Sequence, residues 1–265
     1  MATYNDKLTY LTKAVDSILN QTYKNIEFII VDDSNNKETI EYLLSLPVLD
    51  NRVKVIHNEE KQGFVKSLNI GLMASKGVYI ARMDSDDISI SDRIEKQVSY
   101  LNNNEKTSIL GAGITIINED GKVTGKRKYK SSFEDLKKVM FFRSPVAHPT
   151  IMFRKSIIDS LGVYDEAFKM SEDYELWLRA VKKGLIIENL EDYLLEYRMV
   201  TDYHKKRNHR QWKYNLRAKV KNFNTKFLVT NSLGILLAIS FMIAPSFVIN
   251  KLYTRDREKP LIYGE

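Results

Sequence analysis

Two short acidic runs could bind a hard cation together with a phosphorylated substrate. Asp32-Asp33 and Asp84-Ser85-Asp86-Asp87 each follow a run of apolar residues directly. Carboxylates alone repel phosphate, but Mg²⁺ or Mn²⁺ takes oxygen ligands from one or two carboxylates together with substrate phosphates. The same residue types also form turns and helix caps. A cation site therefore requires a fold that brings both runs to one place.

A third acidic feature opens a predicted helix. Apolar spacing predicts a helix from Ser171 to Lys183, with Ser171 as its N-cap. Asp173 then lies in the first turn, where the helix dipole favours the ionised carboxylate. Acidic residues are also common in first turns for stability alone.

The elements that position these residues alternate between strand and helix. In open parallel sheets, ligands bind beyond the carboxyl ends of the strands, where both acidic runs are expected. A loop containing Pro47 is expected before the second strand. The spacing predicts helices over Lys7 to Gln21, from near Glu38, and over Gly63 to Ala74, with strands over Ile26 to Val31, Val53 to Ile56 and Val78 to Met83.

The pattern changes after about Arg93. Further strands are predicted over Ile109 to Ile117, Thr150 to Phe153 and Tyr193 to Met199, with a turn at Asn118 to Gly121.

The composition is that of a globular protein, with 43% hydrophobic and 28% charged residues among 265. The chain has no cysteine, which excludes disulfides and thiolate metal sites. The beginning of the chain lacks a basic start followed by an apolar stretch, so it does not read as a signal peptide. A dehydrogenase is disfavoured because Gly111-Ala112-Gly113 lacks the third glycine of a dinucleotide-binding turn and lies too late.

Several motifs, taken in order and spacing, resemble glycosyltransferase family 2 over about residues 2–200. The resemblance implies an α/β fold of the GT-A type, with a mostly parallel sheet flanked by helices and a catalytic domain over residues 1–202. The motifs are Thr3-Tyr4-Asn5, Ile18 to Tyr23, Glu27 to Ser34, Asn69 to Leu72, Gly77 to Asp87, His148-Pro149-Thr150 and Ser171 to Trp177.

The resemblance implies a donor site for a nucleotide-diphosphate sugar, UDP-hexose or UDP-N-acetylhexosamine. Thr3 belongs to this donor site, and Tyr4 and Asp33 would contact the base. Asp84 would lie near the ribose and the sugar. Asp86, with Asp84, would bind the Mn²⁺ or Mg²⁺ that bridges the diphosphate.

On the acceptor side, the resemblance implies that Asp173 is the general base. It would deprotonate an acceptor hydroxyl that attacks the anomeric carbon from the face opposite the nucleotide, so the configuration inverts. His148 and Glu172 are expected on the acceptor side, although a buried, hydrogen-bonded histidine is an equal reading of His148. The string His209-Arg210-Gln211-Trp212 does not match the Gln-x-x-Arg-Trp motif of processive synthases, so one sugar is expected per event.

The start of the chain departs from the family pattern. A hydrophobic strand normally precedes the Thr-Tyr-Asn loop, whereas here Met1-Ala2 stands directly before Thr3. Without that strand, its neighbours would expose unpaired backbone groups and an apolar slot, and Tyr4 would lie on a frayed end. The hypothesis is an internal methionine at position 1 or a truncated gene, which the intact mass of the natural protein tests. The alternative function is an inactive homologue that only binds membranes or partners, which a donor-hydrolysis assay separates from the enzyme.

Residues 203–265 form a basic, then apolar, tail. No acidic residue occurs from Tyr203 to Arg255, and Trp212, Leu216 and Val220 recur at helical spacing among lysines and arginines. This pattern predicts contact with an anionic membrane surface. Residues 227–249 are uncharged and, at about 35 Å as a helix, could span a bilayer or lie in its interface.

The tail fits an enzyme at the cytoplasmic face of the cell membrane. The resemblance implies a polyprenyl-linked saccharide acceptor in polysaccharide biosynthesis, and surface binding raises its effective concentration. A nucleic-acid partner is disfavoured because the basic segment adjoins an apolar run and because acidic strand ends repel phosphate.

Overall fold

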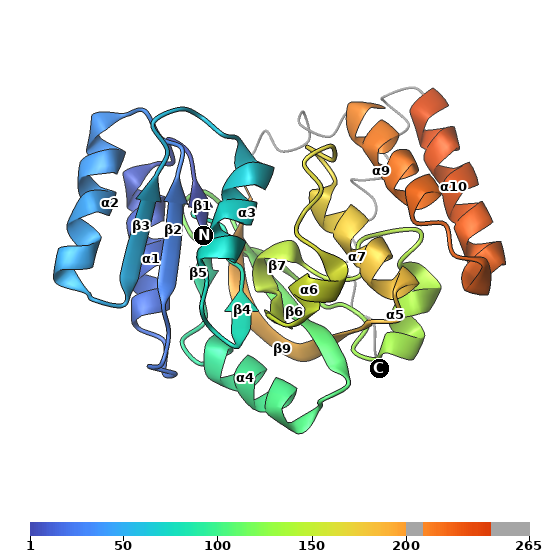
Figure 1. Cartoon of the computed structure of the whole chain (residues 1–265), viewed down its shortest axis with the longest axis horizontal. Coiled ribbons are helices and arrows are strands. Elements are labelled where there is room, and N and C mark those ends of the chain that lie inside the picture. The colour runs from blue at the N-terminus through green and yellow to red at the C-terminus, as the bar shows by residue number, and fades with distance from the viewer. Residues whose placement is uncertain (200–208, 245–265) are drawn as a thin grey trace.

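The computed structural model describes residues 1–199 and 209–244, which form two sheets with flanking helices (Figure 1). The first sheet contains three parallel strands in the order β1-β2-β3, namely β1 (Ala2–Thr3), β2 (Phe28–Asp32) and β3 (Val53–His57). Their parallel direction follows from the crossover helices α1 (Leu8–Leu19) and α2 (Lys37–Leu49). The strand and helix alternation predicted for this region is confirmed.

The helix α2 corrects one expectation, because Pro47 lies inside it and not in a loop. Its N-terminus is capped as the polar run before it predicts, with the Asn36 side chain accepting from the Thr39 N–H at 2.7 Å. Pro47 sits in the last turn, where the missing N–H costs one intrahelical bond. The Asp50 N–H still bonds the Leu46 carbonyl at 2.9 Å and completes the helix end.

Helices cover both faces of the first sheet. Leu11 and Val15 of α1 and Leu43 of α2 are fully buried against Ile30 on one face. The helix α3 (Phe64–Ala74) packs on the other face and joins the main core around Trp177. The acidic end of β2 is therefore held between packed helices.

The second sheet is mixed, and its path runs β4-β8-β6-β9-β5 with β7 beside β6. Only β6 and β9 pair in parallel, whereas the remaining pairs are antiparallel. The strands are β4 (Tyr79–Ala81), β5 (Ile88–Ser89), β6 (Thr107–Ile117), β7 (Val123–Arg127), β8 (Met152–Arg154) and β9 (Ile186–Arg198). The helices are α4 (Arg93–Asn103), α5 (Phe133–Val139), α6 (Ile157–Leu161) and α7 (Glu172–Lys182).

Three details of this sheet differ from the sequence expectation. The last strand begins at Ile186, seven residues before the predicted start, because β6 pairs with it along its whole length. Thr150 lies in a short 3-10 helix, His148–Thr150, and not in a strand. The two-residue strand β5 was not predicted, since Ile88–Ser89 is too short for a periodic pattern.

The strand β1 is short but paired on both sides. Ala2 and Thr3 face Val31 and Asp32 of β2, and Ala2 also bridges Asp84 in parallel. The terminal amine of Met1 donates to the Ile29 carbonyl at 2.9 Å. Residues 1–3 are therefore fixed by backbone hydrogen bonds, and the expectation of a frayed end before Tyr4 is wrong.

The apolar slot expected beside β1 is present. A cavity of about 720 Å³ extends from Met1 between β2 and β4. The Val78 carbonyl and the Arg82 N–H, on either side of β4, form hydrogen bonds with the chain of β8 and its flanks. The backbone groups of the alternate residues Tyr79 and Ala81 therefore face the slot. Its walls are mostly apolar and include Ile29, Leu68, Leu72, Ile80 and Phe153.

The described part of the tail forms α9 (His209–Lys221), a 3-10 turn (Thr225–Phe227) and α10 (Leu228–Ile243). The helix α9 packs against α7, and α10 lies along α9 (Figure 1). Trp212 stacks on Phe241 with ring centroids 4.4 Å apart, so this residue faces α10 and not the outside. The buried Lys219 donates to the Gly234 carbonyl at 2.8 Å. The predicted boundary at residue 202, and residues 245–249 of the apolar run, lie outside the described residues.

The close packing of α10 depends on Gly234. A Cβ at this position would meet the Phe141 carbonyl oxygen well inside contact distance, so Gly234→Ala is expected to destabilise the protein by about 1–3 kcal/mol. Chemical denaturation measures the change. Gly71→Ala in α3 is the matched control, since its Cβ would meet only Val31 at 3.4 Å. An unchanged stability for Gly234→Ala would contradict this packing.

Candidate active site

The carboxyl ends of β1, β2 and β3 form one polar edge around Asp33. Its carboxylate accepts from the Asn58 side chain at 2.7 Å and from the Gly63 N–H at 2.7 Å. Burial alone would raise the pKa of Asp33, but these hydrogen bonds outweigh it and lower the pKa, so the group is ionised. Beside it, the Lys61 ammonium lies 3.4 Å from the ring centre of Tyr4, which is 42% exposed. An exposed aromatic face next to a fixed acceptor can bind a nucleobase.

Asp6 joins this edge to the second acidic run. One of its oxygens accepts from the Thr3 hydroxyl at 2.7 Å and from the Ser85 hydroxyl at 2.6 Å. Asp6 was not predicted as a site residue, although it lies directly after the Thr3-Tyr4-Asn5 motif. Its contacts tie the loop after β1 to the loop after β4.

The second acidic run carries more negative charge than its surroundings neutralise. Asp84 forms an ion pair with the buried Arg82. Burial, and then the charges of Asp84 and Asp6, raise the pKa of Asp86 from 3.8 to about 6. Burial, and then the charges of Asp84 and Asp86, raise the pKa of Asp87 well above its usual range. Crowded carboxylates of this kind favour a cation.

The carboxylates at the strand ends fit a hard cation only if the substrate supplies further ligands. Among residues 1–199 and 209–244, no group of three or more His, Asp or Glu side chains is arranged to hold a metal ion. Asp86 lies close enough to Asp84 that the charge of Asp84, after burial, raises the pKa of Asp86. Mg²⁺ is commonly bound by one or two carboxylates with phosphate oxygens and water, which matches this pair.

Arg198, the last residue of β9, holds the loop that contains Asp86 and Asp87. Its backbone N–H donates to Asp87 at 2.8 Å, and its guanidinium donates to the Asp86 carbonyl at 2.9 Å. Sequence reasoning missed this residue because 111 positions separate it from Asp87. Only the pairing of β9 with β5 and β6 brings it there.

A cavity of about 710 Å³ adjoins the polar edge and collects the predicted acceptor-side residues. Asp84, His148, Glu172 and Asp173 all line it, whereas Thr3, Tyr4, Asp33 and Asp86 lie outside its lining. Burial raises the pKa of the neighbouring Tyr164, and the charges of Asp173, Glu172 and Asp84 add to this against the opposing charge of Arg82. The predicted residues thus form two adjoining parts, with Asp84 common to both.

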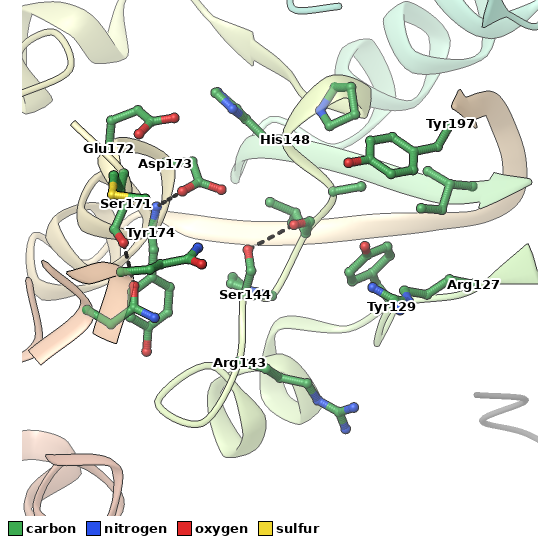
Figure 2. Close-up of a pocket in the computed structure, with 18 of the residues that line it drawn as sticks. Arg127, Tyr129, Arg143, Ser144, His148, Ser171, Glu172, Asp173, Tyr174 and Tyr197 are labelled. Carbon is green, nitrogen blue, oxygen red and sulfur yellow. Dashed lines mark hydrogen bonds between the residues drawn. The ribbon is translucent and has the colours of Figure 1, made fainter. Parts of the chain in front are cut away.

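Asp173 projects from the first turn of α7 into this cavity (Figure 2). One carboxylate oxygen accepts from the Tyr174 N–H at 2.6 Å, which fixes the side chain at the helix start. The helix begins as predicted, but Ser171 does not cap it with its side chain. Its hydroxyl donates instead to Asn215 of α9, so the tail helps to fix the start of α7.

Glu172 is the buried neighbour of Asp173. Burial, and then the charge of Asp173, raise the pKa of Glu172 from 4.5 to about 8. The carboxyl group is therefore largely protonated at neutral pH and can donate a hydrogen bond. Two adjacent carboxyl groups in different environments suit one acid and one base.

The raised pKa of Glu172 makes stability depend on pH. Between pH 4.5 and about 8 the folded state holds a proton that the unfolded state loses, so this residue's contribution to stability falls as pH rises. The melting temperature of Glu172→Gln minus that of wild type is therefore expected to be larger at pH 7.5 than at pH 5. Melting temperatures of both proteins at the two pH values measure this. An equal difference at both would contradict the assignment.

His148 is both buried and on the cavity wall. Its Nε2 lies 2.8 Å from the Tyr164 hydroxyl, and its ring packs edge-on against Trp177. Burial, and then the positive charge of Arg82, lower its pKa well below 6.5, so it is neutral. These contacts make it a positioning residue for Tyr164.

The fold and the polar edge are those of a nucleotide-sugar transferase. The profile of the family described as "Glycosyl transferase family 2" matches residues 1–162, more than half of the chain. The chain belongs to this family and is a glycosyltransferase.

Relatives and solved structures agree with this assignment. The chain is 39% identical over 193 residues to the O-antigen biosynthesis glycosyltransferase WbnJ of Escherichia coli, covering 72% of this chain and 74% of WbnJ. It is 30% identical over 267 residues to the amylovoran biosynthesis glycosyltransferase AmsE of Erwinia amylovora, covering 96% and 97%. S. aureus TarS 1-349 in complex with UDP-GlcNAc shares the fold, with a TM-score of 0.68, 17% identity and coverage of 90% and 70%.

Proposed function

We propose that this glycosyltransferase moves one sugar from a UDP-sugar to an acceptor hydroxyl with inversion at the anomeric carbon. One observation carries the proposal. Asp173, held at the start of α7, faces the same cavity as Asp84, which belongs to the acidic run after β4. A base and a donor-binding carboxylate on one cavity are the arrangement that a single displacement requires.

The reaction balances with the residues present. Asp173 accepts the proton of the acceptor hydroxyl. The oxygen of that hydroxyl bonds to the anomeric carbon, while the bond from the anomeric carbon to the diphosphate breaks. The nucleotide diphosphate leaves with the bonding electrons. A bound Mn²⁺ or Mg²⁺, held by Asp86 and Asp84, would supply positive charge to that leaving group.

Two features support a uridine nucleotide as the donor. Tyr4 offers an exposed ring under the Lys61 ammonium, and Asp33 offers an ionised acceptor beside it. The UDP-GlcNAc complex of TarS, which shares the fold, supports the same class of donor. UDP-hexoses and UDP-N-acetylhexosamines are therefore the donors to test.

A donor screen tests the proposed function. The purified protein is incubated with individual nucleotide sugars and Mn²⁺ or Mg²⁺, and the released nucleotide diphosphate is measured. We expect slow release by water from one UDP-sugar, lost when EDTA is added. Release that is absent with every donor would favour the alternative of an inactive homologue that only binds membranes or partners.

We propose further that α10 binds the enzyme to the cytoplasmic face of the membrane without spanning it. Within the described chain, the segment Thr225–Ile243 is long and apolar enough to cross a bilayer. However, Asn231, Gly234 and Ala238 are buried against the protein. The opposite face exposes Leu228, Val229, Leu233, Leu236 and Ile243, and the neighbouring helix α9 exposes the basic residues Lys213 and Arg217. A lipid-linked acceptor in polysaccharide biosynthesis fits this location.

A charge on the exposed face of α10 should weaken membrane binding. Leu236→Glu, at a position 61% exposed, is expected to reduce binding to phosphatidylglycerol vesicles at least about tenfold, because it removes apolar contact and adds repulsion. Vesicle sedimentation measures this. Val48→Glu, at an 88% exposed position on α2, is the matched control and should bind as wild type does. Equal binding by all three proteins would refute the assignment to α10.

A further inference from the structure

The cavity that holds Asp173 has a second, basic end. Arg127, Lys128, Lys130 and Arg143 line it together with the acidic residues. Figure 2 shows Glu172 and Asp173 on one side of the pocket and Arg127 on the other, with Arg143 below them. The two signs of charge are therefore separated within one cavity.

The basic end carries net positive charge. At the acidic end Arg82 is already paired with Asp84, and the buried Lys219 bonds the Gly234 carbonyl. Lys128 has a weak ion pair with Glu191 at 4.0 Å. The backbone of Arg127 pairs with β6, but its guanidinium makes no hydrogen bond or ion pair with any residue within 1–199 and 209–244. Its guanidinium, half-buried on the cavity wall, is thus available to a ligand.

Aromatic rings lie beside the basic side chains. Figure 2 shows Tyr129 next to Arg127 and Tyr197 above them, and both tyrosines line the cavity. Aromatic faces can pack against the apolar faces of sugar rings, and arginine binds phosphate through two parallel N–H bonds. This part of the cavity offers surfaces for both groups.

We propose that the basic end binds a phosphate group of the acceptor, while the acceptor hydroxyl lies at Asp173. The proposal rests on the proposed function and adds the acceptor's chemical class, a phosphorylated saccharide. The donor diphosphate belongs with Asp84 and Asp86, so the basic end is left for a second anion. Electrostatics then orient the acceptor, since its phosphate is repelled from the acidic end and attracted to Arg127 and Arg143.

Two phosphate sources share this chemistry, a prenyl diphosphate linker and a phosphodiester within a glycan. The test measures binding of inorganic pyrophosphate, farnesyl diphosphate and glycerol phosphate to the full chain by calorimetry, with EDTA present to exclude metal-dependent binding at the donor site. The proteins are wild type, Arg127→Gln, and Arg127→Gln combined with Arg143→Gln. Lys126→Gln is the matched control, because Lys126 is the neighbour of Arg127 in β7 and lies outside the cavity lining.

We expect wild type and Lys126→Gln to bind pyrophosphate equally. Arg127→Gln should bind about tenfold more weakly and the double variant more weakly still. Tighter binding of farnesyl diphosphate than of pyrophosphate would identify the lipid linker as the source, and preference for glycerol phosphate would identify the glycan. Equal affinity for pyrophosphate in wild type and the double variant, with both proteins folded by circular dichroism, would overturn the proposal.

The outcome is separable from the proposed function. If wild type releases no nucleotide from any donor but still binds pyrophosphate through Arg127, the enzyme assignment fails while the phosphate site stands. If nucleotide release from the donor is normal but the substitutions at Arg127 and Arg143 leave pyrophosphate affinity unchanged, the phosphate site is wrong and the proposed function stands.

Discussion

Asp173→Asn is expected to reduce sugar transfer by about 10²–10⁴-fold, the usual contribution of a general base. The amide cannot accept the proton of the acceptor hydroxyl. It can still accept the Tyr174 N–H through its carbonyl oxygen, so the start of α7 should keep its structure. Donor affinity should not change, because Tyr4 and Asp33, the residues proposed to bind the nucleotide base, lie outside the cavity that Asp173 lines. The measurements are the rate of nucleotide diphosphate release with acceptor present and the Kd of the UDP-sugar.

A matched acidic residue controls for general effects of lost charge. Asp159 lies in the first turn of α6, is exposed, and stands outside the cavity lining. Asp159→Asn should transfer sugar at the wild-type rate. Full activity of Asp173→Asn would remove Asp173 from the mechanism and transfer the role of base to another carboxylate of the cavity.

Asp86→Asn is expected to weaken metal-dependent binding of the UDP-sugar by at least about tenfold and to abolish transfer. The expectation follows from the surroundings of Asp86, because burial, and then the charges of Asp84 and Asp6, raise its pKa to about 6. A bound cation would balance these carboxylates. Titration of donor into protein with Mn²⁺, and again with EDTA, measures the effect. The two proteins should differ only when metal is present.

The melting temperature of Asp86→Asn distinguishes a loss of function from a loss of folding. Removing a buried carboxylate that is costly to ionise relieves repulsion, so Asp86→Asn should melt no lower than wild type at neutral pH. Asp120→Asn, in the exposed turn before β7, should change neither donor binding nor melting. A variant of Asp86 with wild-type donor affinity in Mn²⁺ would exclude this residue as a metal ligand.

The local elements of the fold could be predicted because short-range sequence patterns indicate them. Ile26 to Val31 is nearly continuous in apolar residues, and the strand it predicts is β2. Asn36 follows the acidic run and caps α2 as its residue type suggests. Both acidic runs stand at strand ends as predicted, but β4 belongs to the second sheet, and the bridge between Ala2 and Asp84 brings its end beside β1.

Contacts over long sequence distances could not be predicted. The pairing of β6 with β9 places Arg198 behind Asp86, and no local pattern encodes that partnership. Ser171 has the residue type of an N-cap, yet its hydroxyl bonds Asn215 because α9 packs against α7. The stripe containing Trp212 predicts an apolar partner without saying whether it is a lipid or the ring of Phe241.

The slot that begins at Met1 has a practical consequence for handling the protein. The terminal amine is buried and neutral at pH 7, since burial, and then the charge of Arg82, lower its pKa from 8.0 to about 5. Residues attached to that nitrogen, such as an affinity tag, would have to run along the channel between β2 and β4. An alternating apolar sequence could pair with both strands there, whereas a polyhistidine stretch would place imidazoles among Ile29 and Ile80. Attachment at the other end of the polypeptide avoids this interference.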